Sequence, residues 1–153
     1  MSRLIYLGQG LAFGPSILTR LVQQVNPSLF DERLSPDRFT LREVLAHMAD
    51  LEPVILVRMN LALSSPGSDV PNFDQDQEAI DKNYASWDIS SSLEKFADSR
   101  SKTCALFESL TTEQTRLTVN HPILGEVSIF DLAVFALGHD TYHFEQISQY
   151  ASG

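Results

Sequence analysis

Two histidines four residues apart, His139 and His143, have a type and spacing that could do chemistry. Their apolar surroundings predict the last helix of the chain, and residues i and i+4 lie above one another on the same face of a helix. Two imidazoles placed in this way can bind one metal ion, and His47, in an earlier helical segment, could add a third. Three neutral imidazoles with one open coordination position are a ligand set of catalytic zinc sites.

The residues alone also allow a structural interpretation of these histidines. A single histidine on an apolar face is more often a hydrogen-bonded core residue than a ligand, because both ring nitrogens need partners there. Two at this spacing, with a third on another helix, favour a metal, because bundle cores build metal sites from facing helices.

Several other polar residues could support such a site. Asp50 and Gln146, each three residues after a predicted ligand, could fix the orientation of an imidazole through its second ring nitrogen. Asp140 and Glu145 are either further partners or solvated carboxylates. His121, in a loop, is interpreted as an exposed turn residue.

Composition limits the class of protein. The chain has 153 residues, of which 43% are hydrophobic and 20% are charged, which predicts one globular domain over residues 1–153. A net charge of −9 argues against binding to nucleic acid or to an anionic membrane. The one cysteine, Cys104, cannot form an intramolecular disulfide and is expected to be a buried structural thiol.

The location of the protein is predicted from what the sequence does not contain. The apolar N-terminal run is broken by Gly8 and Gly10 and lacks a clear cleavage site, unlike a signal peptide. No apolar stretch is long enough to span a bilayer. We therefore expect a cytoplasmic protein.

Apolar residues recur at helical spacing in four segments, which predict helices over about 10–25, from 35 or 40 to about 63, 91–110 and 128–150. A kink is expected at Pro53, inside the second helix. Residues 64–88 form a long connection with room for a helical turn at 74–84, and residues 111–125 a polar connection with room for a short extended piece. The fold class predicted is all-α, a four-helix bundle with a long crossover.

Three stretches, residues 41–52, 121–128 and 138–147, resemble motifs of the DinB/YfiT-like superfamily of small bacterial four-helix bundles. The resemblance implies an up-down-down-up bundle. It also implies that His47, His139 and His143 together bind a divalent transition metal, with nickel or zinc the expected ion.

The same resemblance implies two kinds of metal-dependent enzyme, a thiol S-transferase that uses a low-molecular-weight thiol, or a hydrolase, acting on a small molecule. It also implies a homodimer. A thiol that carries carboxylates would need a basic contact, for which Arg42, Arg58, Lys82 and Arg116 are candidates. The alternative is a non-catalytic module, a metal-binding or stress-response dimer without an open coordination position.

Overall fold

The structure is a computed structural model that describes residues 4–151. Four long helices dominate it, and four short helical elements and a hairpin lie in the connections between them. The long helices are α1 (Leu4–Gln23), α2 (Leu41–Ser64), α4 (Ile89–Ser109) and α5 (Ile129–Ala151). The connections contain the short helix α3 (Gln75–Asp81), the strands β1 (Thr118–His121) and β2 (Gly125–Ser128), and the 3-10 turns η1 (Pro27–Leu29), η2 (Tyr84–Ser86) and η3 (Gln114–Arg116).

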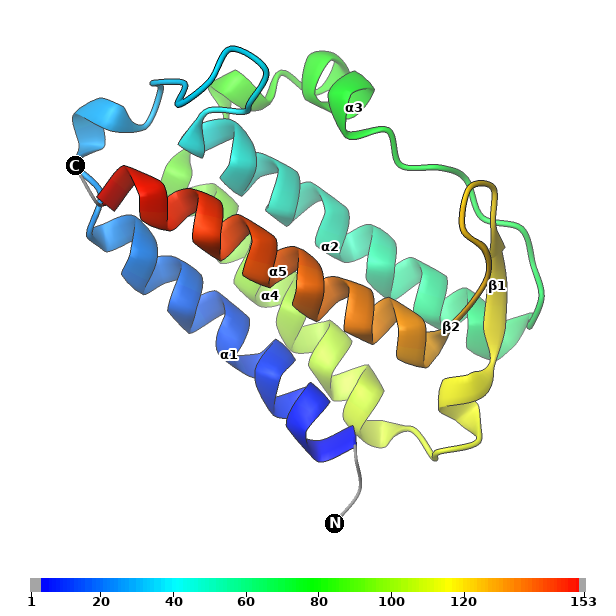
Figure 1. Ribbon diagram of the computed structural model, residues 1–153. Coiled ribbons are helices and arrows are strands. Elements are labelled where there is room, and N and C mark those ends of the chain that lie inside the picture. The colour runs from blue at the N-terminus through cyan, green and yellow to red at the C-terminus, as the bar shows by residue number, and fades with distance from the viewer. Residues whose placement is uncertain (1–3, 152–153) are drawn as a thin grey trace.

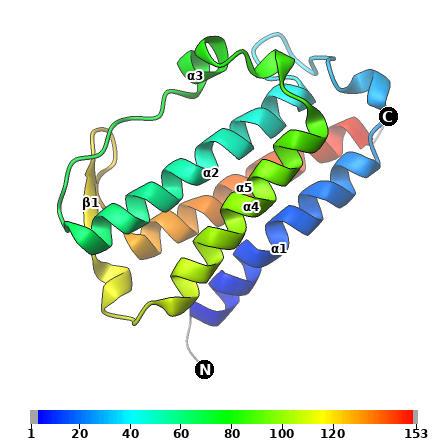
Figure 2. The ribbon, with the colours of Figure 1, turned by 180° about the vertical axis from the view of Figure 1, so that it is seen from behind.

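The long helices form an up-down-down-up bundle, as predicted. Helices α1 and α5 run in one direction and α2 and α4 in the other (Figure 1). Helix α2 packs against α4 and α5, and α1 packs against the same two helices on the other side. Because α2 and α4 run in the same direction, the chain between them must return along the length of the bundle, and Figure 2 shows this crossover with α3 near its far end.

Local sequence signals explain where two of the helices begin. A capping box starts α2, in which Glu43 N donates to Thr40 Oγ1 at 3.2 Å and Thr40 N donates to Glu43 Oε2 at 2.8 Å. Helix α2 then continues through Pro53 to Ser64. At α5, Ser128 N donates to Asp131 Oδ2 at 2.9 Å, which gives the cap expected there.

The other two long helices begin earlier than predicted. Helix α1 starts at Leu4 and includes Gly8, which was expected to precede it, because Leu7 and Leu11 bury its first turns against the core. Helix α4 is capped by Asp88 rather than by one of the serines that follow, since Ser91 N donates to Asp88 Oδ2 at 2.8 Å.

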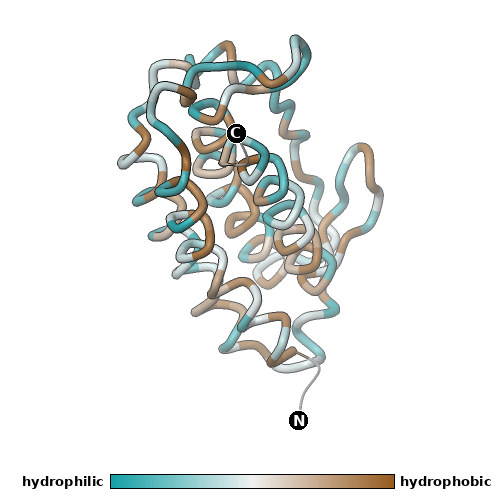
Figure 3. The backbone as a smooth tube through the Cα atoms, turned by 60° about the vertical axis from the view of Figure 1, so that its left-hand side comes forward, coloured by the Kyte–Doolittle hydropathy of each residue, from teal (hydrophilic) through white to brown (hydrophobic). Residues whose placement is uncertain are grey.

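The core has two apolar clusters, one toward each end of the bundle, and each draws on three or more of the long helices. Hydrophobic segments recur along each of these helices between hydrophilic ones (Figure 3), as expected for helices with one buried face. Cys104 is buried in the cluster that holds the start of α1, as predicted, and burial raises the pKa of its thiol. No helix within residues 4–151 is long and apolar enough to cross a membrane.

The connection before α5 is a two-stranded antiparallel hairpin, in which Thr118 pairs with Ser128 and His121 with Gly125. Gly125 has a φ of +74°, which favours glycine at this turn. The crossover adds to the edge of this hairpin, since Val70 N donates to Asn120 O at 3.0 Å. Two connections that are far apart in the sequence are therefore joined beside the bundle.

Candidate metal centre and its cavity

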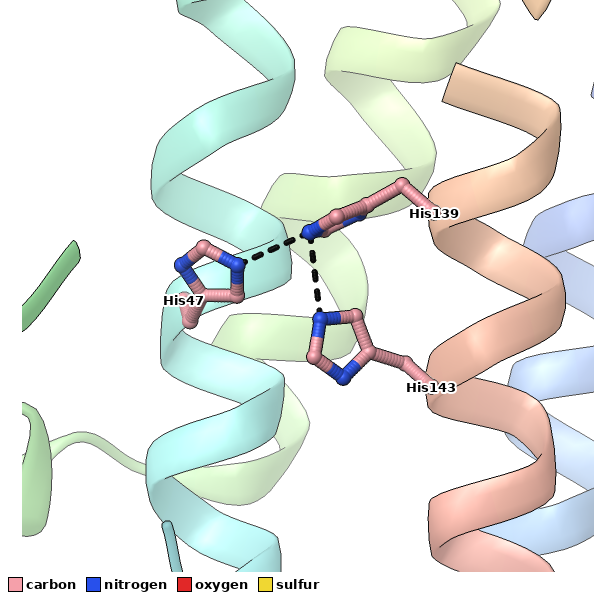
Figure 4. Close-up of side chains that lie close together, drawn as sticks. All are labelled: His47, His139 and His143. Carbon is pink, nitrogen blue, oxygen red and sulfur yellow. Dashed lines mark hydrogen bonds between the residues drawn. The ribbon is translucent and has the colours of Figure 1, made fainter. Parts of the chain in front are cut away.

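The three predicted ligands converge on one point between α2 and α5 (Figure 4). His139 Nε2 lies 2.9 Å from His47 Nε2 and 3.1 Å from His143 Nε2. One ligand nitrogen from each ring lies within 4.8 Å of the others. Zinc–nitrogen bonds of 2.0–2.1 Å in a tetrahedral site would separate two ligand nitrogens by about 3.3 Å, so the two short separations made by His139 Nε2 lie within a few tenths of an ångström of that spacing.

All three imidazoles are held in the neutral form that metal binding requires. The pKa of His47 is lowered to about 3, chiefly by burial and to a lesser extent by the neighbouring imidazole of His143. The same causes lower the pKa of His139 to about 2, and burial lowers the pKa of His143. The lone pairs of three neutral rings therefore face one another at short range.

The second ring nitrogens indicate how these lone pairs are oriented. His143 Nδ1 lies 2.9 Å from Gln146 Oε1, so Nδ1 donates its hydrogen and leaves a lone pair on Nε2. A hydrogen on His139 Nε2 can point at only one of its two close neighbours, whereas a cation can accept lone pairs from all three rings. The donor set fits a divalent transition metal.

Asp50 does not form the expected hydrogen bond to His47. His47 Nδ1 has no hydrogen-bond partner among the described residues. Asp50 Oδ2 instead accepts from Lys82 Nζ and Tyr84 Oη, both at 2.7 Å, which ties the crossover to α2. Its charge still partly opposes the lowered pKa of His47, as a minor effect beside burial.

Asp140 forms part of a buried ionic layer beside the metal centre and is not solvated. Arg100 Nε and Nη2 donate to Glu52 at 2.8 Å each, and its Nη1 and Nη2 donate to Asp140 at 2.5 and 3.0 Å. Thr103 Oγ1 adds a bond to Glu52 at 2.8 Å. These residues join α2, α4 and α5 at the level of the histidines, so the layer fixes how the two ligand-bearing helices lie.

A largely apolar cavity of about 450 Å³ opens beside the metal centre. His47 and His139 form part of its wall, Phe73 comes from the crossover, and Ile123 and Leu124 come from the hairpin. The histidines therefore face a space large enough for a small molecule.

A second cavity of about 170 Å³ also borders the triad. His139 borders both cavities, whereas His143 and Gln146 border only the smaller one. The histidine triad therefore lines two cavities.

The sequence did not identify two buried residues of the larger cavity. His121 is only 9% exposed, contrary to its interpretation as an exposed turn residue. Arg58 was one of four equal candidates, and it is 6% exposed and lines the same cavity. The helical period alone would place Arg58 on the face of His47, because eleven residues are three turns of a helix.

Comparison with known proteins gives a consistent result. The family model described as DinB superfamily matches residues 11–147. Two proteins of Oceanobacillus iheyensis, each named "putative metal-dependent hydrolase", are similar in sequence. The first is 30% identical over 132 residues, which cover 84% of this chain and 75% of the relative. The second is 25% identical over 137 residues, which cover 88% and 77%.

One solved structure has the same fold. It is YfiT from Bacillus subtilis, described as a probable metal-dependent hydrolase with an unusual four-helix-bundle topology. The TM-score is 0.92 over 99% of this chain and 89% of that chain, at 21% sequence identity. With its up-down-down-up bundle and its match over nearly the whole sequence, the chain belongs to the DinB superfamily.

Proposed function

We propose that this protein is a metal-dependent hydrolase of small molecules, with His47, His139 and His143 as ligands of a divalent transition metal, nickel or zinc. The observation that carries the proposal is the convergence of three neutral Nε2 atoms at the wall of an apolar cavity. The names of the relatives from Oceanobacillus iheyensis and of YfiT support the same class of reaction.

A divalent ion with three imidazole ligands and an open position acts as a Lewis acid that lowers the pKa of a bound water or thiol. The protein would orient the ligands and bind the substrate. Gln146 holds the tautomer of His143 that leaves Nε2 free for the metal. The apolar wall would bind the substrate and exclude bulk water from the reacting group.

Thiol S-transfer is the second candidate function. The specific observation in its favour is that His139 borders two separate cavities, of about 450 and 170 Å³. A transfer reaction has two reactants, and each would bind in its own cavity beside the triad. Hydrolysis needs one organic substrate and water, so the larger cavity alone would serve it.

The metal content of protein purified without an affinity tag tests both candidates. We expect about one transition metal per chain in the wild type after incubation with zinc or nickel, and its loss in His139→Ala. His121→Ala is the matched control, because His121 lies outside the triad and should leave the metal content unchanged. A metal that binds only the folded protein should also raise the melting temperature.

Activity then separates the candidates. The loaded protein would be tested on a panel of small esters and amides, and on electrophiles in the presence of low-molecular-weight thiols. Turnover in the first panel that is lost in His139→Ala supports hydrolysis, and turnover in the second supports S-transfer. No metal in the wild type under any loading condition would refute both and leave the non-catalytic module.

A further inference from the structure

We propose that the larger cavity recognises its ligand by a carboxylate group, which binds at Arg58 and His121, while the reacting end of the ligand extends toward the histidine triad. The orientation toward the triad rests on the proposed function. The carboxylate site itself does not, because it is formed by residues outside the triad.

Arg58 is a buried cation that lacks a counter-ion. Its side chain is 6% exposed, and its Nη2 donates to Pro71 O at 2.8 Å. Within residues 4–151, its Nε has no hydrogen-bond partner and no carboxylate forms an ion pair with it. Leaving a buried charge unpaired is costly, so the site has a strong preference for an anion.

The other deeply buried arginine shows how this fold treats such a charge. Arg100 is 1% exposed and is bound by two carboxylates, Glu52 and Asp140. Arg58 is buried almost as deeply, yet it lines a cavity instead of meeting an acidic residue. The contrast indicates that the partner of Arg58 comes from outside the chain.

His121 adds a neutral donor to the same wall. Its Nδ1 accepts from the backbone N–H groups of Ile123 and Leu124, both at 3.2 Å, so the hydrogen of the neutral ring is on Nε2. Burial, and second the charge of Arg58, lower the pKa of His121. A carboxylate can accept hydrogen bonds from both the guanidinium and this Nε2–H.

The remaining charged residues near these connections are already engaged or lie elsewhere. Arg42 pairs with Asp31. Lys82 pairs with Asp50. Arg116 is exposed and lines a different hollow.

The cavity itself has little negative charge. Asp131 is the one carboxylate among the described residues that line it, and its Oδ2 accepts from Ser128 N and Oγ at 2.9 and 2.6 Å. The pairing of Asp131 with the helix cap leaves Arg58 as the group that an anionic ligand would meet.

The geometry of α2 sets the length of the ligand. His47 and Arg58 are eleven residues apart, which is three turns, so they lie on the same face with their Cα atoms about 16 Å apart. Leu51 lines the cavity between them. The arrangement selects an elongated molecule, with an anionic end, an apolar middle and a reactive group at the other end.

Binding of hexanoate and hexanamide to the full chain tests the proposal without any assay of activity. We expect hexanoate to bind about tenfold or more tightly than the uncharged hexanamide, because hydrogen bonds to charged groups contribute strongly. Hexanoate should also shift the ¹H–¹⁵N resonance of Arg58 Nε, assigned by its loss in Arg58→Lys. Equal binding of the two compounds would overturn the proposal with the wild type alone.

Three variants locate the site. Arg58→Met should weaken hexanoate binding about tenfold while hexanamide binding stays the same. Arg116→Met removes the same charge from an exposed position and should leave both unchanged. His143→Gln removes a metal ligand that does not line the larger cavity, and hexanoate binding should survive it.

The outcomes keep this inference apart from the proposed function. Hexanoate binding that is lost in His143→Gln but kept in Arg58→Met would assign the anion to the metal and refute the role of Arg58. A protein that binds no metal but still prefers hexanoate through Arg58 would refute the proposed function and support the carboxylate site.

Discussion

Gly14 of α1 lies where a side chain cannot be accommodated. A Cβ atom built on it would lie 2.8 Å from both Arg100 Nη1 and Asp140 Oδ2. The contact brings the backbone of α1 against the ionic layer, and Leu11 O accepts a hydrogen bond from Arg100 Nη1 at 3.1 Å. The absence of a side chain at Gly14 therefore lets α1 pack directly against the buried ionic layer.

The substitution Gly14→Ala should lower the free energy of unfolding by about 1–3 kcal/mol, because the buried network cannot move aside without losing hydrogen bonds. Gly138→Ala is the matched control, since no atom lies within 4 Å of its added Cβ, and it should be neutral or stabilising by up to about 1 kcal/mol. Urea denaturation of the two variants measures the difference. Equal stabilities would show that the network relaxes around the methyl group.

The neutral histidines make the metal-free protein sensitive to acid. The pKa values of about 3 for His47 and about 2 for His139 lie below the ordinary value of 6.5. Between the folded and the ordinary pKa, the unfolded chain therefore binds more protons than the folded protein. The free energy of unfolding should therefore fall as the pH is lowered from about 6.5, by about 1 kcal/mol per pH unit for each histidine.

The window from pH 6.5 to 5, in the presence of a chelator, lies above the range in which ordinary carboxylates titrate. Denaturation across it should show a shallower slope for His47→Leu than for the wild type. An identical slope in the variant would mean that His47 is not the source of the acid sensitivity.

The residues around the candidate metal centre could be predicted from the sequence to different degrees. His139 and His143 share a helix, so their spacing predicts that they meet, and the structure brings them together with His47. The burial of His121 depends on where two connections meet beside the bundle, which no local pattern encodes. For Arg58, the helical period indicates the face it shares with His47 but not the cavity it lines.

At the scale of elements, the crossover is held by a small polar cluster. Tyr84 is fully buried in η2, and its hydroxyl donates to Asp50 Oδ2 at 2.7 Å, beside the ion pair from Lys82. These contacts fasten the end of the crossover to α2 one turn from His47. The position of the cavity wall depends on them, because the same connection contributes Phe73.

Tyr84→Phe should destabilise the protein by about 1.5–3 kcal/mol, because it removes a buried hydrogen bond to a charged group. Tyr142→Phe, at a side chain that is 61% exposed, should have no measurable effect. Thermal denaturation of both variants provides the comparison. If Tyr84→Phe has the same melting temperature as the wild type, Lys82 alone is sufficient to hold Asp50.

Element boundaries were predicted best where a cap is visible. The capping box at Thr40 and the cap at Ser128 are both formed. The start of α1 was missed because tertiary burial of Leu7 outweighs the low helix propensity of Gly8 and Gly10, which follow it. The hairpin was missed as a sheet because its two strands have only four residues each.

At the scale of the whole molecule, the topology followed from the family resemblance, whereas the pattern of the residues gave only the number of long helices. A long connection between the second and third long helices is compatible with several bundle topologies. The parallel run of α2 and α4 shows why it is long, since it must span the bundle (Figure 2).

We propose a homodimer as the assembly, as the family resemblance implies. Large apolar side chains are exposed on α1 and α5, and their burial against a second copy would favour association. They are Ile5, Tyr6, Phe13, Phe130, Val134, Phe135 and Tyr142.

Light scattering should give a mass twice the 17.1 kDa of the chain, and Phe13→Glu should shift it to the monomer. Val57→Glu, at an exposed valine of α2, is the matched control. A monomer at all concentrations of the wild type would contradict the dimer.

The hydrogen bonds between the crossover and the hairpin edge bear on how proteins of this fold can diverge. The three histidines lie on helices that a buried ionic layer joins, whereas much of the wall of the larger cavity lies on connecting segments. Connections tolerate insertion and exchange better than core helices do. Exchange of these two segments would therefore change the cavity wall and leave the histidine triad as it is.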